Sequence, residues 1–249
     1  MIKNYPKMDF NLRTLLNRLS LILLSSLLFS SSCYAEQDLT PFKAKYLVSR
    51  NDTTIGERIH HLQATQSGYV YKATMQTTGL AAIFKPGAIT EQSTLNVIDN
   101  RIVPHFYEYT DSNKPRKNAH LNFDWQQLKV TNNIGAKPWK MSIPNGTQDK
   151  FSYMLALMQD LQKGNTTMQY DIADGGRLKT YRFDSLGTEK IETVLGTLNT
   201  IKMRRIRVGK QNRFTYLWCA PSLGFLPVKV ERHKGDNTYT MLVEQIDGL

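Results

Sequence analysis

Phe42-Lys-Ala-Lys-Tyr-Leu-Val48 is the stretch from which the fold of this chain can first be predicted. Its apolar residues Phe42, Ala44, Tyr46 and Val48 alternate with Lys43, Lys45 and Ser49, and only Leu47 interrupts the polar set. Successive side chains of a β-strand point to opposite faces of the sheet, so one face of this segment is apolar and the other polar. The stretch therefore predicts a strand with one buried face.

The same period of two recurs along most of the chain. It is clearest in residues 69–75, 121–125, 226–230 and 239–243. Turn sequences such as Ser67-Gly68 and Lys234-Gly235-Asp236 separate such segments at short intervals. This spacing predicts about twelve to fourteen short strands. We therefore expect a mainly β protein, an antiparallel β-barrel or curved half-barrel.

One segment, residues 147–163, breaks the period of two and predicts a packed α-helix. Its apolar residues fall at helical spacing: Phe151, Met154, Leu155, Met158 and Leu161. Thr147 is a suitable N-terminal cap, and Lys163-Gly164 is a typical helix end. An apolar stripe of this kind must pack against another element, and the sheet is the partner we expect.

The stretch Phe214-Thr-Tyr-Leu-Trp-Cys-Ala220 is apolar on both faces, which is typical of a strand covered on both sides. We therefore expect the helix to lie near it. Cys219 is interpreted as a packed core thiol, because no base accompanies it in the sequence.

Residues 1–35 have the layout of a secretory signal peptide. Lys3, Lys7, Arg13 and Arg18 precede an apolar run of about 11 residues, and small residues lead up to Ala35. We expect cleavage after about Ala35, which leaves 36–249 as a single exported β-barrel-like domain in the periplasm. A lipoprotein anchored at Cys33 and an uncleaved N-terminal anchor are the alternatives.

The charge balance is moderately basic. The chain has 32 Lys and Arg against 21 Asp and Glu. Removing residues 1–35 takes away four basic residues and Asp9, so the mature chain carries 28 basic and 20 acidic residues, a net charge of +8. This excess favours anionic partners such as a lipid or another anionic envelope component, and peripheral membrane contact. Because the chain is expected to be exported, this positive charge does not indicate a nucleic acid as its partner.

The sequence offers no catalytic, metal or cofactor motif. It has no G-x-S-x-G elbow, no G-x-G-x-x-G fingerprint and no phosphate-binding loop. His60 and His61 are adjacent, so in a strand they point to opposite faces. An acid pair for a glycosidase would need distant residues such as Glu91 and Glu108. We therefore expect a protein that is not an enzyme, with no cofactor and no metal.

Two stretches are candidate binding sites. The first runs from Thr77 to Gly87 and is apolar without alternation. It could line an apolar cavity, or it could be a buried turn that plugs one end of the barrel. The second is basic, Lys202-Met-Arg-Arg-Ile-Arg207, and it could form an anion-binding rim or a solvated outer face. The ligand-binding residues expected are Leu80, Ile83, Phe84 and Trp218, and the rim residues are Arg204, Arg205 and Arg207.

Alternation in the basic stretch places Arg205 and Arg207 on one face and Arg204 on the other. Because Ile201 and Met203 share the face of Arg205, the pattern slips near Arg204, and we expect a β-bulge there.

Several pieces of the chain, taken in order, resemble the bacterial exported family called domain of unknown function 3108. They include Tyr46-Leu-Val-Ser-Arg50, Thr78-Gly-Leu-Ala-Ala-Ile-Phe84, Phe123-Asp-Trp125, Gln148-Asp-Lys-Phe-Ser152 and the stretch from Leu217 to Glu231. The resemblance implies an exported, mainly β protein, and no functional residues. Leu217-Trp218 and Leu226-Pro227-Val228 also resemble a strand pair of periplasmic lipoprotein carriers and related half-barrels.

These observations favour a non-catalytic periplasmic envelope protein that binds a lipid, glycolipid or other amphipathic ligand. A structural or protein-protein interaction module of the envelope, with a solid core, is the alternative. An envelope polysaccharide hydrolase is the third hypothesis. The sequence leaves the oligomeric state open.

Overall fold

The computed structural model describes residues 38–249, except 80–81, 83–86 and 134–137. These residues belong to one compact unit, Glu36–Leu249. The leader predicted for residues 1–35 lies outside the described residues, and so do Leu80, Ile83 and Phe84.

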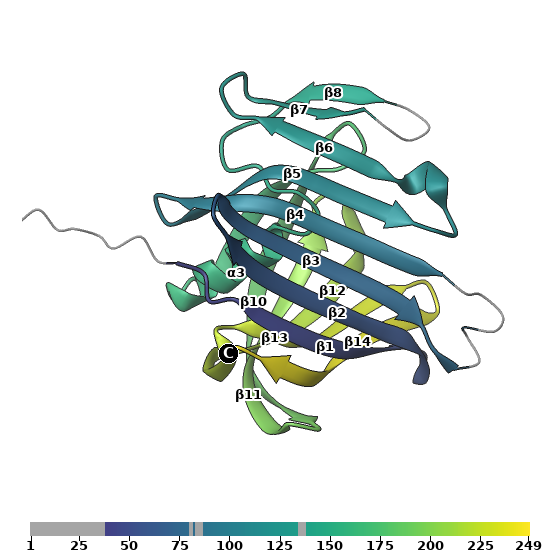
Figure 1. Ribbon diagram of the computed structural model, residues 1–249. Coiled ribbons are helices and arrows are strands. Elements are labelled where there is room, and N and C mark those ends of the chain that lie inside the picture. Colours follow the sequence, from purple (N-terminus) through teal and green to yellow (C-terminus); the bar gives the residue numbers. More distant parts are fainter. Residues whose placement is uncertain (1–37, 80–81, 83–86, 134–137) are drawn as a thin grey trace, which may run out of the picture. The chain divides into compact units, whose positions relative to one another are not determined.

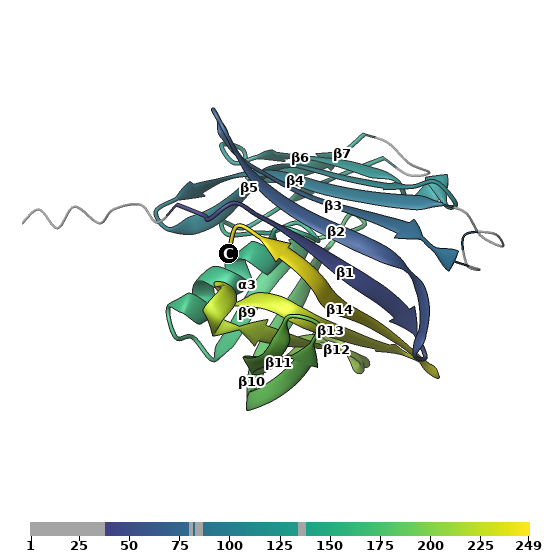
Figure 2. The same ribbon diagram turned by 60° about the horizontal axis from the view of Figure 1, so that its bottom comes forward.

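The predicted alternation is confirmed in the first strand. Phe42, Ala44, Tyr46 and Val48 are all buried, and none is more than 5% exposed. Among the described residues the chain forms fourteen strands, labelled in Figure 1 except for β9, which is labelled in Figure 2. They are β1 (Phe42–Arg50), β2 (Thr53–Thr65), β3 (Gly68–Thr77), β4 (Ala88–Ile98), β5 (Arg101–Asp111), β6 (Ala119–Asp124), β7 (Lys129–Asn132), β8 (Trp139–Ser142), β9 (Thr167–Ala173), β10 (Leu178–Thr193), β11 (Gly196–Arg207), β12 (Lys210–Ala220), β13 (Leu226–Lys234) and β14 (Asn237–Asp247).

The strands form one antiparallel sheet in the order β8-β7-β6-β5-β4-β3-β2-β1-β14-β13-β12-β11-β10-β9. The chain thus builds two meanders, and the first and last strands pair with each other in the middle of the sheet. We call β1–β8 the N-terminal half-sheet and β9–β14 the C-terminal half-sheet. Since β8 and β9 are the two edges, the sheet is not closed, which confirms the half-barrel prediction over the barrel.

The predicted helix is present as α3 (Tyr153–Gln162), and two short 3₁₀ helices, η1 (Pro115–Lys117) and η2 (Pro221–Leu223), lie in loops. Its end agrees with the prediction, because Lys163 is the C-cap and Gly164 has a φ of 82°. Its start is six residues later than predicted. Thr147 does not cap the helix, since its hydroxyl donates to the carbonyl of Pro144.

The residues just before α3 are instead used to join the two half-sheets. The backbone N–H of Gln148 donates to Asp171 on β9, and the carbonyl of Gln148 accepts from Ala173. The Gln148 side chain donates to the carbonyl of Ile102 on β5 at 2.8 Å. These bonds hold the segment extended, so the helix cannot begin there.

Helix α3 lies between the two half-sheets and packs on both (Figure 2). One set of its side chains, Leu155, Ala156 and Met158, belongs to a core cluster shared mainly with β1–β7. Another set, Tyr153, Leu157 and Leu161, packs with side chains of β9–β12 that include Leu217 and Cys219. The expected position of the helix near β12 is therefore confirmed, and its apolar surface is broader than the single stripe that was predicted. A helix that is apolar on most sides is a buried helix.

Candidate functional site

An apolar row of side chains crosses four strands on the face of the sheet that points toward α3. Val48 on β1 is paired with Met241 on β14, Met241 with Val230 on β13, and Val230 with Leu217 on β12. All four side chains line one cavity. We call them the apolar row.

A polar row runs beside it, two residues further along the same part of the sheet. Tyr239 on β14 is paired with Arg232 on β13, Arg232 with Thr215 on β12, and Thr215 with Arg205 on β11. These four residues, the polar row, line the same cavity. A strand rises about 3.3 Å per residue, so the two rows are about 7 Å apart.

The cavity has a volume of about 440 Å³. Its other walls come from β2 and β3, through Ile55 and Met75, and from the start of the helical segment, through Phe151 and Met154. The apolar row lies on the enclosed side, where Leu217 is 1% exposed, whereas Arg232 on the polar row is exposed. A concave site of this size, mostly apolar with a few placed polar groups, is typical of small-molecule binding.

A hydrogen-bonded network at the cavity wall holds Arg58. Its Nη2 donates to Glu91 at 2.8 Å, and its Nε donates to Nε2 of His60 at 2.9 Å. The Tyr107 hydroxyl donates to the other oxygen of Glu91 at 2.6 Å. Because Arg58 occupies Nε2 of His60, the remaining ring proton is assigned to Nδ1, which lies 2.8 Å from the Tyr71 hydroxyl. Burial, together with the charge of Arg58, lowers the pKa of His60, so the ring is neutral and the network has no net charge.

The side chain of Arg205 is held in place by its neighbours. Nη1 donates to the Tyr153 hydroxyl, and Nη2 donates to the Thr215 hydroxyl at 3.0 Å. The guanidinium also lies 4.8 Å from the ring centre of Tyr181 and 5.6 Å from that of Tyr153. Aromatic stacking of this kind suits arginine and leaves little freedom to the side chain.

Two further cavities, of about 620 and 420 Å³, adjoin the first. Lys150 and Arg232 line all three, and Arg205 lines the first and the smaller neighbour. Lys150 directly precedes Phe151, and its ammonium lies 5.0 Å from the ring centre of Tyr109. These cations therefore stand at the junction through which the cavities meet.

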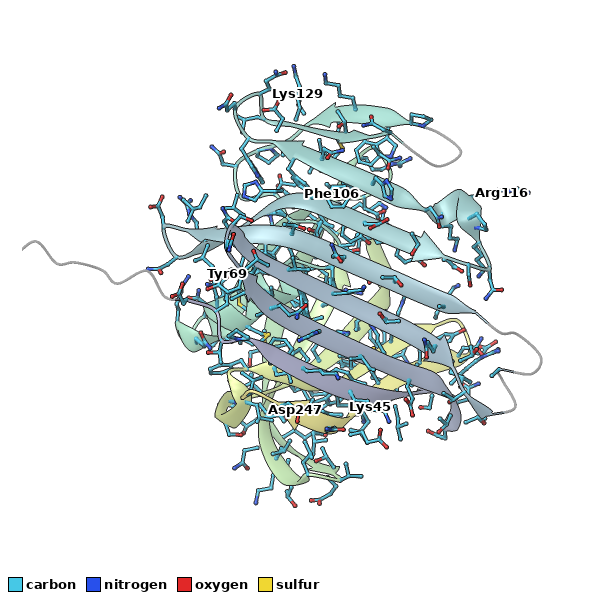
Figure 3. All side chains as sticks on the ribbon, viewed as in Figure 1. Lys45, Tyr69, Phe106, Arg116, Lys129 and Asp247 are labelled. Atoms are coloured by element: carbon cyan, nitrogen blue, oxygen red, sulfur yellow. The ribbon has the colours of Figure 1, made fainter. Side chains whose placement is uncertain are left out.

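The cations of the junction differ from those on the opposite face of the sheet. Several cations on that face are paired with acids: Lys45 (labelled in Figure 3) with Glu57 and Glu244, Lys202 with Glu189, Lys229 with Glu231 and Arg204 with Asp184. Within the part of the chain that the structure describes, Lys150, Arg205 and Arg232 have no carboxylate partner. The two acids that line the adjoining cavity, Glu91 and Asp174, are already paired with Arg58 and Lys179.

The predicted anion rim is split by the sheet. Arg205 and Arg207 line the smaller adjoining cavity, whereas Arg204 points to the other face and pairs with Asp184 at 3.6 Å. Grouping the three arginines in one rim was therefore wrong. The bulge expected near Arg204 lies on the neighbouring strand: the pairing of β10 with β11 shifts between Ser185 and Thr188, opposite Met203 and Ile201. Strand β11 itself stays regular there, so Arg205 keeps its phase with Met203.

Trp218 does not line the cavity. It follows Leu217 and points to the opposite face, where its indole N–H donates to Glu189 at 3.0 Å. The ammonium groups of Lys202 and Lys229 lie 4.8 and 4.5 Å from its ring centre. Only 3% of the side chain is exposed, so the structure gives it a packing role and Leu217 the place on the cavity wall.

The carboxylates considered for an acid pair do not face each other. Glu91 points toward the cavity, whereas Glu108 is bonded to His120 at 2.7 Å on the other side of the sheet. The pairing of Glu91 with Tyr109, next to Glu108, explains this opposition. In the residues that the structure describes, no group of three or more His, Cys, Asp or Glu side chains could hold a metal ion.

Arg58, Lys150 and Arg232 line the site but are not among the residues predicted from the sequence. Arg58 and Arg232 nevertheless carry a signal, because each shares a face with a less exposed residue two positions away: Arg58 with the buried His60, and Arg232 with the half-buried Val230. A charged residue at an inward-facing position points to a polar interior. Lys150 precedes a helix and follows no such period, so only the fold reveals it.

The sequence profile of the family described as "Protein of unknown function (DUF3108)" matches residues 45–244. The chain belongs to this family. That membership confirms the resemblance carried by the sequence motifs. Among curated proteins, none is significantly similar in sequence to this member of DUF3108.

One solved structure shares the architecture of this DUF3108 protein. The beta-barrel-like protein of domain of unknown function DUF1849 from Brucella abortus has a TM-score of 0.57 and 10% sequence identity, over 85% of this chain and 98% of that one. At this identity the likeness shows the fold alone. A Bacteroides fragilis protein with a YmcC-like fold matches at 11% identity over 84% of this chain and 97% of that one, but with a TM-score of 0.34.

Proposed function

We propose that this protein is an exported, non-catalytic envelope protein that binds an amphipathic ligand such as a lipid or glycolipid. Hydrocarbon would lie on the apolar row, and the polar part of the ligand would lie on the polar row. The observation that carries the proposal is the placement of these two rows about 7 Å apart in one cavity of about 440 Å³.

Export is supported by the layout of residues 1–35, and the periplasm is the compartment we propose. Among the described residues, no helix is both long and apolar enough to cross a membrane. The mass of the mature N-terminus tests this part: cleavage after Ala35 gives a soluble chain, and a lipid-modified Cys33 gives an anchored one.

The proposal contains no catalytic step. Glu91, the carboxylate on the cavity wall, accepts hydrogen bonds from Arg58 and Tyr107, and its suggested partner Glu108 points away. The Cys219 thiol is buried, and burial raises its pKa, so at neutral pH it is not a nucleophile.

Native mass spectrometry of the chain recovered from its own cell envelope tests the proposal. We expect an adduct of lipid size that is released by organic extraction. A bare protein mass in repeated gentle preparations, with no uptake of short-chain lipid added afterwards, would reject ligand binding and favour an interaction module with a solid core.

A further inference from the structure

The polar row places two arginines on the same face of the sheet with one threonine between them. Arg205 and Arg232 are both paired with Thr215, from β11 and β13 on either side of β12. Neighbouring strands are about 4.8 Å apart, so the two Cα atoms are about 10 Å apart. Two arginine side chains can converge on one small anion from that separation.

The guanidinium of Arg205 has N–H donors left that could bind such an anion. An arginine has five N–H donors, and Arg205 uses one for Tyr153 and one for Thr215. The other three have no protein acceptor among the described residues. Because the guanidinium is already stacked on Tyr181, little side-chain entropy remains to be lost when an anion binds.

The local charge argues for an anion with more than one negative charge. Lys150, Arg205 and Arg232 line the same cavities, and none has a carboxylate partner in the described part of the chain. Like charges at such separations repel, so one carboxylate would leave most of the excess positive charge uncompensated. A phosphate monoester carries nearly two charges near neutral pH and offers three acceptor oxygens. Arginine pairs, moreover, suit bidentate contacts to phosphate.

We infer that Arg205, Thr215 and Arg232, together with Lys150, bind the phosphate group of a phosphorylated lipid whose acyl part lies on the apolar row. This inference rests on the proposed function and names the headgroup class for the same site. The apolar row begins about 7 Å away, so a phosphate and the first carbons of an attached chain span the two rows.

The test uses short-chain lipids that stay monomeric, titrated into the full mature chain by calorimetry. Dihexanoyl phosphatidic acid has the phosphate, dihexanoylglycerol has the same chains without it, octanoate has a carboxylate instead, and inorganic phosphate has no chain. We expect the phosphatidic acid to bind at least about tenfold tighter than the other three, a difference of about 1.4 kcal/mol.

Two variants and a control locate the effect. Arg232→Gln changes an exposed residue and should remove most of the preference for phosphatidic acid over dihexanoylglycerol, because the charge is lost. Arg205→Lys should weaken phosphate binding, because lysine cannot keep both the fork contacts and the stacking on Tyr181. Arg204→Gln, on the opposite face of the same strand, should bind phosphatidic acid like the unchanged protein.

Each other outcome overturns the inference in a distinct way. Equal affinity for phosphatidic acid and dihexanoylglycerol would remove the phosphate site and leave the amphipathic ligand in place. Tighter binding of octanoate would make the headgroup a carboxylate. Inorganic phosphate bound as tightly as the lipid would make the ligand a free anion. No binding of any of the four would reject the proposed function together with this inference.

Discussion

The carboxylate of Asp149 accepts a hydrogen bond from the Ser93 hydroxyl at 2.6 Å, and this contact joins the start of helix α3 to strand β4. The other oxygen of Asp149 accepts from the backbone N–H groups of Phe151 and Ser152, both at 2.7 Å. In return, the backbone N–H of Asp149 donates to the Ser152 hydroxyl at 3.0 Å. This reciprocal pair has the pattern of a capping box in the turn just before Tyr153. A single buried carboxyl therefore closes the turn that leads into α3 and joins that turn to the sheet.

The first prediction concerns the pH dependence of stability at Asp149. Burial raises its pKa to about 6, although the hydrogen bonds that it accepts act in the opposite direction. A carboxyl whose pKa is higher in the folded state adds stability that is fully present below pH 4 and is lost as the pH rises through 6. The loss amounts to roughly 3 kcal/mol.

Asp149→Asn keeps the acceptor for the two N–H groups and can donate to Ser93, but it does not titrate. We therefore expect the stability of the unchanged protein to fall relative to this variant between pH 4 and 6, in urea unfolding followed at several pH values. Parallel profiles would contradict the assignment. Asp149→Ala should cost at least about 2 kcal/mol at every pH, because it leaves buried donors without an acceptor.

The second prediction concerns Gly56 on β2. It is paired with Val48 on β1, directly beside the point where the register of these two strands shifts. A Cβ atom at this position would lie 2.2 Å from the carbonyl oxygen of Gln76 on β3. Since that neighbour is backbone, Gly56→Ala should lower the free energy of unfolding by about 1–3 kcal/mol, and Gly56→Val by more. Gly87→Ala is the control, because the atoms it would meet belong to the side chains of Asn113 and Ser112, which can turn away. Equal melting temperatures for the Gly56 and Gly87 variants would show that β2 and β3 can separate freely.

Much of the fold follows from local pattern. The period of two in β1 predicts which of its residues are buried, and Lys163-Gly164 marks the end of α3, because both depend only on the geometry of a single element. The start of α3 could not be predicted in the same way. Gln148 is helix-compatible, yet its bonds to β9 and β5 hold it extended.

The candidate site depends on information that no local pattern contains. Arg205 and Arg232 meet across Thr215 only because β11, β12 and β13 are neighbours in register. Lys150 joins them because the segment before α3 crosses between the half-sheets. The sequence does carry one usable signal, since Arg58 is in phase with the buried His60, and Arg205 with the buried Met203.

The third prediction concerns Trp218, which packs on the face opposite the cavity. Trp218→Ala should destabilise the protein by roughly 3–5 kcal/mol, because a ring that is 3% exposed leaves a large void. Trp218→Phe should cost less, since it loses mainly the hydrogen bond to Glu189. Ligand affinity of the Phe variant should match that of the unchanged protein in the calorimetric titration. A selective loss of affinity would instead restore the sequence-based prediction that Trp218 touches ligand.

The fourth prediction uses the two faces of β14. Met241 is part of the apolar row, whereas its neighbour Leu242 is paired with Leu47 and Lys229 and points away from the cavity. Met241→Trp should fill part of the 440 Å³ cavity and reduce the affinity for dihexanoylglycerol and dihexanoyl phosphatidic acid alike, by about tenfold or more. Leu242→Trp adds the same ring to the other face and should leave both affinities unchanged.

Thermal unfolding of both variants distinguishes a filled cavity from a misfolded protein. Only a folded Met241→Trp protein that has lost affinity supports the apolar row as the place where acyl chains bind. If folded Met241→Trp protein keeps full affinity for both lipids, the hydrocarbon lies elsewhere.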